Sequence, residues 1–149
     1  MRRILVALML GVATHIGTAD AANEPPQLDL DHVKSGRVVY QKYCASCHGA
    51  NARGAANWQE RDEHGELPAS PHDAEGHTWR HSDAELYEMV SRGWRDPFNK
   101  TKRLTMPAFG DVLSLEQIRD VITYLKTLWT SEQRSFQSEE SQDHPFPSR

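Results

Sequence analysis

Cys44-Ala45-Ser46-Cys47-His48 is the stretch that decides this sequence, and it holds the only two cysteines among the 149 residues. Two thiols separated by two residues can each bond to one vinyl group of the same porphyrin. The histidine that follows them then lies under the iron as a ligand. The motif therefore predicts one covalently attached haem c, with Cys44 and Cys47 as the attachment points and His48 as an iron ligand.

Three other interpretations of this motif explain the sequence less well. A redox-active CxxC pair would follow a strand, and no strand pattern precedes Cys44. A structural zinc site needs four ligands, whereas the motif supplies three. A disulfide between Cys44 and Cys47 would close a very short loop and would constrain the chain little.

The first residues have the pattern of an export signal. Two arginines precede a short apolar run, and an Ala-x-Ala cleavage pattern ends at Ala21. We therefore expect a signal peptide over residues 1–21 and a periplasmic mature protein, with an uncleaved anchor as the alternative. The apolar run is shorter than the about 20 residues that a bilayer span requires, so we expect no stable membrane insertion.

The charge of the chain limits its partners. The formal net charge is -4, and loss of the leader, with its two arginines, makes the mature chain slightly more acidic. This argues against nucleic acid or an anionic membrane as a partner, and it favours a basic patch on another protein.

Apolar residues recur every three or four positions in three stretches, so we expect an all-α domain over residues 31–130 after a loose lead-in over residues 22–30. Asp31 can cap a first helix that ends near Tyr43. Ser82 and Ser114 each begin a capping box, with Glu or Gln three residues later, at the start of the other two helices.

The segments between these helices are long and polar. Residues 49–78 and 94–110 show no periodicity, and loops of this length commonly carry function, here by wrapping around the haem. The tail over residues 131–149 is polar, and we expect it to lack fixed structure, with a docking segment as the alternative. Without an internal repeat or a second CxxCH, the chain is predicted to be one domain with one haem.

From about Asp31 to Trp129 the sequence resembles the class I, mitochondrial-like monohaem cytochromes c of bacterial periplasmic type. In that family a first helix leads into CxxCH and a last helix crosses it. Gly36 and Tyr40 match the glycine and aromatic positions of the first helix. Val121 and Tyr124 match the positions of the last helix that pack against them.

The resemblance also implies a methionine from a late loop as the sixth iron ligand. Met106, followed by Pro107, is similar to that segment in many bacterial members, and a following proline favours extended backbone. Met89 falls on the apolar face of a predicted helix, where methionine commonly fills the core. We therefore expect Met106 to be the ligand. The alternative is a loop histidine, namely His64, His72, His77 or His81.

The loop over residues 51–79 departs from the family pattern. Family members place a loop carbonyl, often that of a proline, against the proximal histidine, and Pro68 and Pro71 are both candidates. The haem propionates require donors and cations, and Trp79 is the first candidate for haem binding there, although a packing role fits it equally. The other candidates are Arg53, Arg80, Arg92 and Trp94.

These inferences together imply a monomeric periplasmic electron carrier that cycles between Fe(II) and Fe(III). With both axial positions filled, no open position is left on the iron, so we expect that the protein is not an enzyme. Its partners would be redox proteins: a dehydrogenase, a cytochrome complex or a terminal oxidase. Two alternatives stay open, a haem-based sensor with a labile sixth ligand and a dedicated cytochrome subunit of a dehydrogenase or oxidase.

Overall fold

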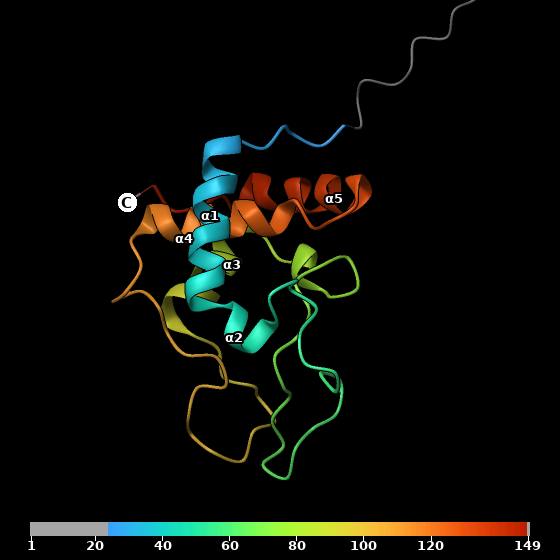
Figure 1. Ribbon diagram of the computed structural model, residues 1–149, viewed down its shortest axis with the longest axis vertical. Helices are drawn as coiled ribbons and strands as arrows, with labels where there is room; N and C mark the ends of the chain where they lie inside the picture. Colours follow the sequence, from blue (N-terminus) through green and yellow to red (C-terminus); the bar gives the residue numbers. More distant parts are fainter. Residues whose placement is uncertain (1–23, 149) are drawn as a thin grey trace, which may run out of the picture.

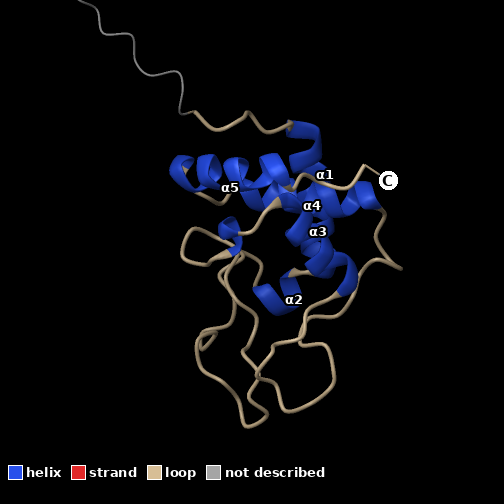
Figure 2. Cartoon of the chain, turned by 180° about the vertical axis from the view of Figure 1, so that it is seen from behind, coloured by secondary structure: helices blue, strands red, loops and turns tan. Residues whose placement is uncertain are grey.

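The computed structural model describes residues 24–148, and in this range the chain forms helices and loops but no strand (Figure 2). The elements in chain order are α1 (Leu30–Tyr43), α2 (Ala45–His48), the 3-10 turn η2 (Thr78–Arg80), α3 (Asp83–Arg92), α4 (Leu115–Lys126) and α5 (Ser131–Asp143) (Figure 1). The expected all-α class is confirmed. The predicted signal peptide over residues 1–21 lies outside the described residues.

Helix α1 crosses α4 at Gly36. A Cβ atom at this position would lie 1.9 Å from the carbonyl oxygen of Asp120 and 2.9 Å from Tyr124 Cβ. Only a residue without a side chain lets two backbones approach so closely. One turn along α1, the ring of Tyr40 packs on that of Tyr124 at 5.4 Å between centroids. The predicted crossing of the first helix with this later helix is confirmed.

The start of α1 differs from the prediction. Asp29, not Asp31, is the capping residue, and its Oδ1 accepts hydrogen bonds from the backbone N–H groups of Asp31 and His32 at 2.8 and 3.2 Å. Asp31 instead lies in the first turn, where the positive end of the helix dipole stabilises its carboxylate. The helix therefore begins earlier than the apolar pattern indicated.

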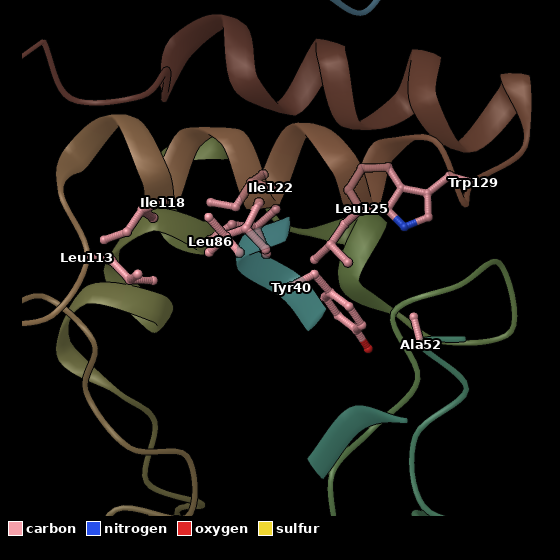
Figure 3. Packing of buried hydrophobic residues seen from close by; sticks show 10 residues of the cluster. Tyr40, Ala52, Leu86, Leu113, Ile118, Ile122, Leu125 and Trp129 are labelled. Atoms are coloured by element: carbon pink, nitrogen blue, oxygen red, sulfur yellow. The ribbon is translucent and has the colours of Figure 1, made fainter. Parts of the chain in front are cut away.

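The apolar core lies where α1, α3 and α4 meet (Figure 3). Most of its buried residues come from these three helices, with Trp129 just beyond α4 and two from loops. The buried hydrophobic residues are Val39, Tyr40, Ala52, Leu86, Leu113, Ile118, Val121, Ile122, Leu125 and Trp129. The core thus lies on the helical side of the molecule. It includes Ala52, near the start of the segment that follows α2, and Leu113, near the end of the segment that precedes α4.

Helices α3 and α4 begin where the capping boxes predicted. The Ser82 hydroxyl accepts from the Glu85 N–H while the Glu85 carboxylate accepts from the Ser82 N–H, and Ser114 and Gln117 do the same for α4. These reciprocal bonds satisfy two of the free amides of each helix.

The tail expectation was wrong, because residues 131–143 form helix α5. Thr130 caps it through a capping box with Gln133. The face of α5 that packs on the domain is polar: Gln137 is buried and donates to Asp83 Oδ1 at 2.8 Å, to Ser141 Oγ at 2.9 Å and to the His81 carbonyl at 3.3 Å. A polar tail can therefore pack as a helix when its buried groups find partners.

Two long loops complete the domain. The first connects α2 to η2, and the second connects α3 to α4, as the sequence predicted. Within the second, Trp94 and Met106 form an isolated antiparallel bridge, with N–H to O distances of 3.0 and 2.9 Å. Both loops extend away from α4 and α5 (Figure 1).

Candidate haem-attachment site

The CxxCH motif lies at the end of α1, where the chain turns into the single helical turn α2. His48 N and Cys47 N both donate to the Cys44 carbonyl, at 3.0 and 3.2 Å. Positions i, i+3 and i+4 of a helix share one face, so Cys44, Cys47 and His48 emerge together. Gly49 ends the turn at φ 80°, a conformation that glycine adopts readily.

The two cysteines are unbridged thiols. Cys47 is exposed, and Cys44, the C-terminal capping residue of α1, is half-buried. Burial and the neighbouring Cys47 raise the pKa of the Cys44 thiol to about 11. Neither sulfur atom is in a disulfide, and Cys47 Sγ accepts only a long hydrogen bond from the Ser46 hydroxyl at 3.9 Å.

His48 is buried and its ring is fixed by the loop that follows. Its Nδ1 donates to the carbonyl oxygen of Ser70 at 2.8 Å. A carbonyl can only accept, so Nδ1 carries the proton and the lone pair of the neutral ring is on Nε2. Burial lowers the pKa of His48 and so favours this neutral form. The ring therefore offers Nε2 to a metal.

The carbonyl that accepts from His48 differs from both candidates that the sequence indicated. Neither Pro68 nor Pro71 supplies the carbonyl; Ser70, directly before Pro71, does. Pro71 cannot donate a hydrogen bond and restricts Ser70 to an extended conformation. The proline therefore acts on the backbone that carries the acceptor.

His72 is a neighbour of the proximal histidine that the sequence did not single out for this role. Its ring stacks on that of His48 at 4.0 Å between centroids and 30° between planes. Its carbonyl accepts from Trp129 Nε1 at 2.9 Å, and its Nδ1 lies 2.8 Å from Thr78 Oγ1. Burial lowers the pKa of His72 well below its ordinary value, so the ring is neutral. Its place against the face of His48 favours a supporting role over ligation on the opposite side of an iron.

The other candidate histidines lie elsewhere in the loops. His64 is exposed beside Glu63, and His77 and His81 contact each other edge to face at 5.6 Å. Within residues 24–148, none of these three is hydrogen-bonded to His48 or stacked on its ring.

Met106 is half-buried in the second loop, and Met89 lies on α3 as predicted. The Met106 backbone is fixed by the bridge to Trp94. Three residues further on, Phe109 packs edge to face on Tyr43, the residue before Cys44, at 6.3 Å. The structure therefore brings the segment that carries Met106 against the attachment segment.

Trp79 lies on η2 with its ring against Phe136 of α5 at 5.6 Å. Its indole N–H donates to the Gly76 carbonyl at 3.1 Å. The packing interpretation accounts for these contacts, and binding of a propionate by Trp79 stays a prediction. Among the other candidates, Arg80 lies over the Trp79 ring and Arg92 pairs with Glu88.

The donor set fits a haem attached through a CxxCH motif. Two unbridged thiols share a face with a neutral imidazole whose Nδ1 is held by a carbonyl, which is the arrangement that orients a metal-bound histidine. A small all-α domain whose first helix crosses a later one and ends in such a site is typical of c-type haem proteins.

A family model described as Cytochrome c matches residues 33–129. The chain therefore belongs to the cytochrome c family, in agreement with the resemblance to its class I monohaem members, and membership implies covalently bound haem c.

Three curated relatives are each described as a Cbb3-type cytochrome c oxidase subunit FixP. The proteins of Sinorhizobium medicae (strain WSM419) and Rhizobium meliloti (strain 1021) are 29% and 28% identical over 104 residues, 69% of this chain and 32% of theirs. That of Azorhizobium caulinodans is 27% identical over 109 residues, 73% of this chain and 33% of its own. The chain thus matches about a third of the length of these relatives.

Proposed function

We propose that the chain is a periplasmic one-electron carrier whose single haem c is bound through Cys44 and Cys47 and ligated by His48 and Met106. The haem supplies an iron that alternates between Fe(II) and Fe(III). The observation that carries the proposal is the hydrogen bond from His48 Nδ1 to the Ser70 carbonyl. It fixes the tautomer and the orientation in which Nε2 can serve as a ligand.

In this proposal the protein would hold His48 and Met106, the two residues that would ligate the iron, without rearrangement. Ser70 and His72 fix the ring of His48, and the bridge to Trp94 fixes the backbone of Met106. A thioether ligand favours Fe(II) and raises the reduction potential. With His48 and Met106 both bound, the iron would have no position left for a substrate, so we propose electron transfer and not catalysis.

The partners in this proposal are redox proteins. Because the relatives are oxidase subunits, a second candidate is a dedicated cytochrome subunit that serves one oxidase. No helix within residues 24–148 is long and apolar enough to cross a bilayer. Purification of a tagged chain from its native host separates the two candidates: a stoichiometric oxidase complex supports the subunit, and a monomer in the periplasmic fraction supports the carrier.

Covalent attachment is tested by the pyridine haemochrome spectrum of protein made with a haem-attachment system. Cys44→Ser or Cys47→Ser should leave one thioether, shift the absorption band and lower the yield of holoprotein. The double variant should be mostly unfolded, because the haem supplies much of the apolar interior of so small a domain. Ser46→Ala, between the cysteines, is the matched control: it removes only the long contact of the hydroxyl to Cys47 Sγ and keeps both thiols, so it should behave as wild type. A well-folded double variant without haem would overturn the proposal.

Carbon monoxide separates the carrier from a haem-based sensor. A firmly bound Met106 should block carbon monoxide from the reduced iron. Rapid binding to the wild-type protein would instead indicate a labile sixth ligand and favour the sensor.

A further inference from the structure

The two long loops meet in a region that we call the polar lobe, formed by residues 61–66 and 95–105. The lobe lies at the end of the molecule away from α4 and α5 (Figure 1), and Lys100 N donates to the His64 carbonyl across it at 2.9 Å. None of the buried hydrophobic residues in the described chain belongs to it. Its order must therefore come from polar contacts.

Glu66 is the centre of these contacts. Its side chain is 7% exposed although it is a carboxylate. Asn99 Nδ2 and Thr101 Oγ1 each donate to Oε1 at 3.1 Å, and Arg103 donates from Nε at 3.0 Å and from Nη2. The Arg103 guanidinium lowers the pKa of Glu66, which keeps it ionised. One buried charge from the first loop thus holds three residues of the second loop.

Asp96 makes the second buried contact, and it leads directly to Met106. Arg61 of the first loop donates to Asp96 Oδ2 at 2.7 Å. The backbone N–H of Asp96 donates to Thr105 Oγ1 at 3.0 Å, and Thr105 Oγ1 donates to the Trp94 carbonyl at 2.9 Å. Thr105 precedes Met106, so this chain of bonds ends at the bridge that fixes the Met106 backbone.

The energetics explain why such a polar contact can control a ligand. A loop with few apolar contacts opens at a low free-energy cost, and a ligand on it binds only in the closed fraction. Hydrogen bonds to ionised groups are the strongest polar contacts available, and a buried carboxylate that loses its partners is costly. The occupancy of an iron by Met106 should therefore depend on contacts far from Met106 in sequence.

We propose that Glu66 and Asp96 are positioning residues for Met106, acting by binding the loop that carries it to the polar loop after CxxCH. This inference rests on the proposed His48 and Met106 ligation. It assigns a role to the polar loop, which departs from the family pattern: the loop holds the sixth ligand in reach of the iron.

The test follows the weak near-infrared absorption band of Met-ligated ferric haem in the holoprotein. Urea is added at concentrations that leave the far-UV circular dichroism of the helices unchanged. Glu66→Gln keeps the shape of the side chain and removes its charge. It should increase the equilibrium constant for loss of the band about tenfold, the smallest change expected when a hydrogen bond to a charged group is weakened. Carbon monoxide binding to the reduced protein should accelerate in parallel.

Glu63→Gln is the matched control. It makes the same charge change on the same loop, but its side chain is 87% exposed, so it should match the wild type in both measurements. Met106→Ala, run beside them, tests the ligand itself. If Met106→Ala abolishes the band while Glu66→Gln behaves as Glu63→Gln, the positioning role is wrong and the ligand assignment stands. If Met106→Ala keeps the band, the ligand assignment fails and this inference fails with it.

If Glu66→Gln does not fold, Arg103→Gln tests the same contact from the other partner. The Arg103 side chain is 64% exposed, and its loss leaves Glu66 with Asn99 and Thr101 as donors. The band should be lost at lower urea than in the wild type, with Arg103→Lys between the two. Equal behaviour of Arg103→Gln and the wild type would overturn the inference.

Discussion

In the helical part of the molecule buried apolar side chains gather around the crossing of α1 and α4, with a few buried polar groups such as Asp83 and Asp120 among them. In the polar lobe, by contrast, every buried side chain is polar: Glu66, Asp96 and Asn99. The helical part positions the proximal side of the site, because α1 ends at the CxxCH motif. The polar lobe holds the loop of Met106. Apolar packing is not directional, while hydrogen-bonded carboxylates fix orientation. We therefore expect changes in the helical part to alter the stability of the whole domain and changes in the polar lobe to alter one ligand.

The largest effect on the helical part should come from Gly36→Val. Helix propensity alone would favour valine slightly, but any Cβ here would lie 1.9 Å from the Asp120 carbonyl oxygen. We expect a loss of about 3 kcal/mol or more in the free energy of unfolding, measured by urea unfolding of the holoprotein. Ser35→Val, at the adjacent exposed position of α1, is the control. A neutral Gly36→Val variant would mean that the helices do not meet there.

A smaller effect should come from Gln137→Ala. This change tests whether buried hydrogen bonds also stabilise the helical part. The change removes the donor to Asp83, Ser141 and the His81 carbonyl. Leaving buried acceptors without this partner should cost about 1–3 kcal/mol in the free energy of unfolding. Gln142→Ala, on the exposed side of α5, should cost little. Equal stability of the two variants would show that α5 does not brace the domain.

The smallest effect should be a pH dependence at the helix crossing. His32 Nδ1 of α1 lies 2.5 Å from Asp120 Oδ1 of α4. This hydrogen bond raises the pKa of His32, and the charges of Asp120, Asp29 and Glu116 act in the same direction. The stabilisation is therefore complete below the unfolded pKa of about 6.5 and is lost as the pH rises through the folded value.

His32→Gln should accordingly lower the urea midpoint at about pH 5.5 more than at about pH 8, on either side of the ordinary histidine pKa. The side chain of His32 is partly exposed, so the difference should be small. A deficit that is larger at the higher pH would contradict the assignment of the pair.

The sequence predicted the helical part well, because its signals are local. Apolar periodicity gave α1, α3 and α4, and the capping boxes gave the starts of the last two. It failed for α5, whose buried face carries Gln137 and Ser141. Hydrophobic periodicity does not detect a helix that packs through hydrogen bonds, although the Thr130 and Gln133 capping box was present as a signal.

For the candidate site, the sequence supports a prediction where residue type alone determines the chemistry. The spacing of the motif predicts the roles of Cys44, Cys47 and His48. The acceptor for His48, however, is the main-chain oxygen of Ser70. Every residue has a main-chain oxygen, so residue type does not indicate which one accepts. The stacking of His72 on His48 and the contacts of Glu66 with Arg103 join residues that lie far apart in the sequence. Such pairings depend on the tertiary structure.

The most direct test of the account is the near-infrared spectrum of the ferric holoprotein in the wild type, Met106→Ala and Met89→Ala. The wild type should show the band of Met-ligated haem. Met106→Ala should lose it with the haem still bound, and its midpoint potential should fall by about 100 mV or more. Met89→Ala, on α3, should keep the band. A band that survives in Met106→Ala and disappears in Met89→Ala, or that is absent from the wild type, would contradict ligation by Met106.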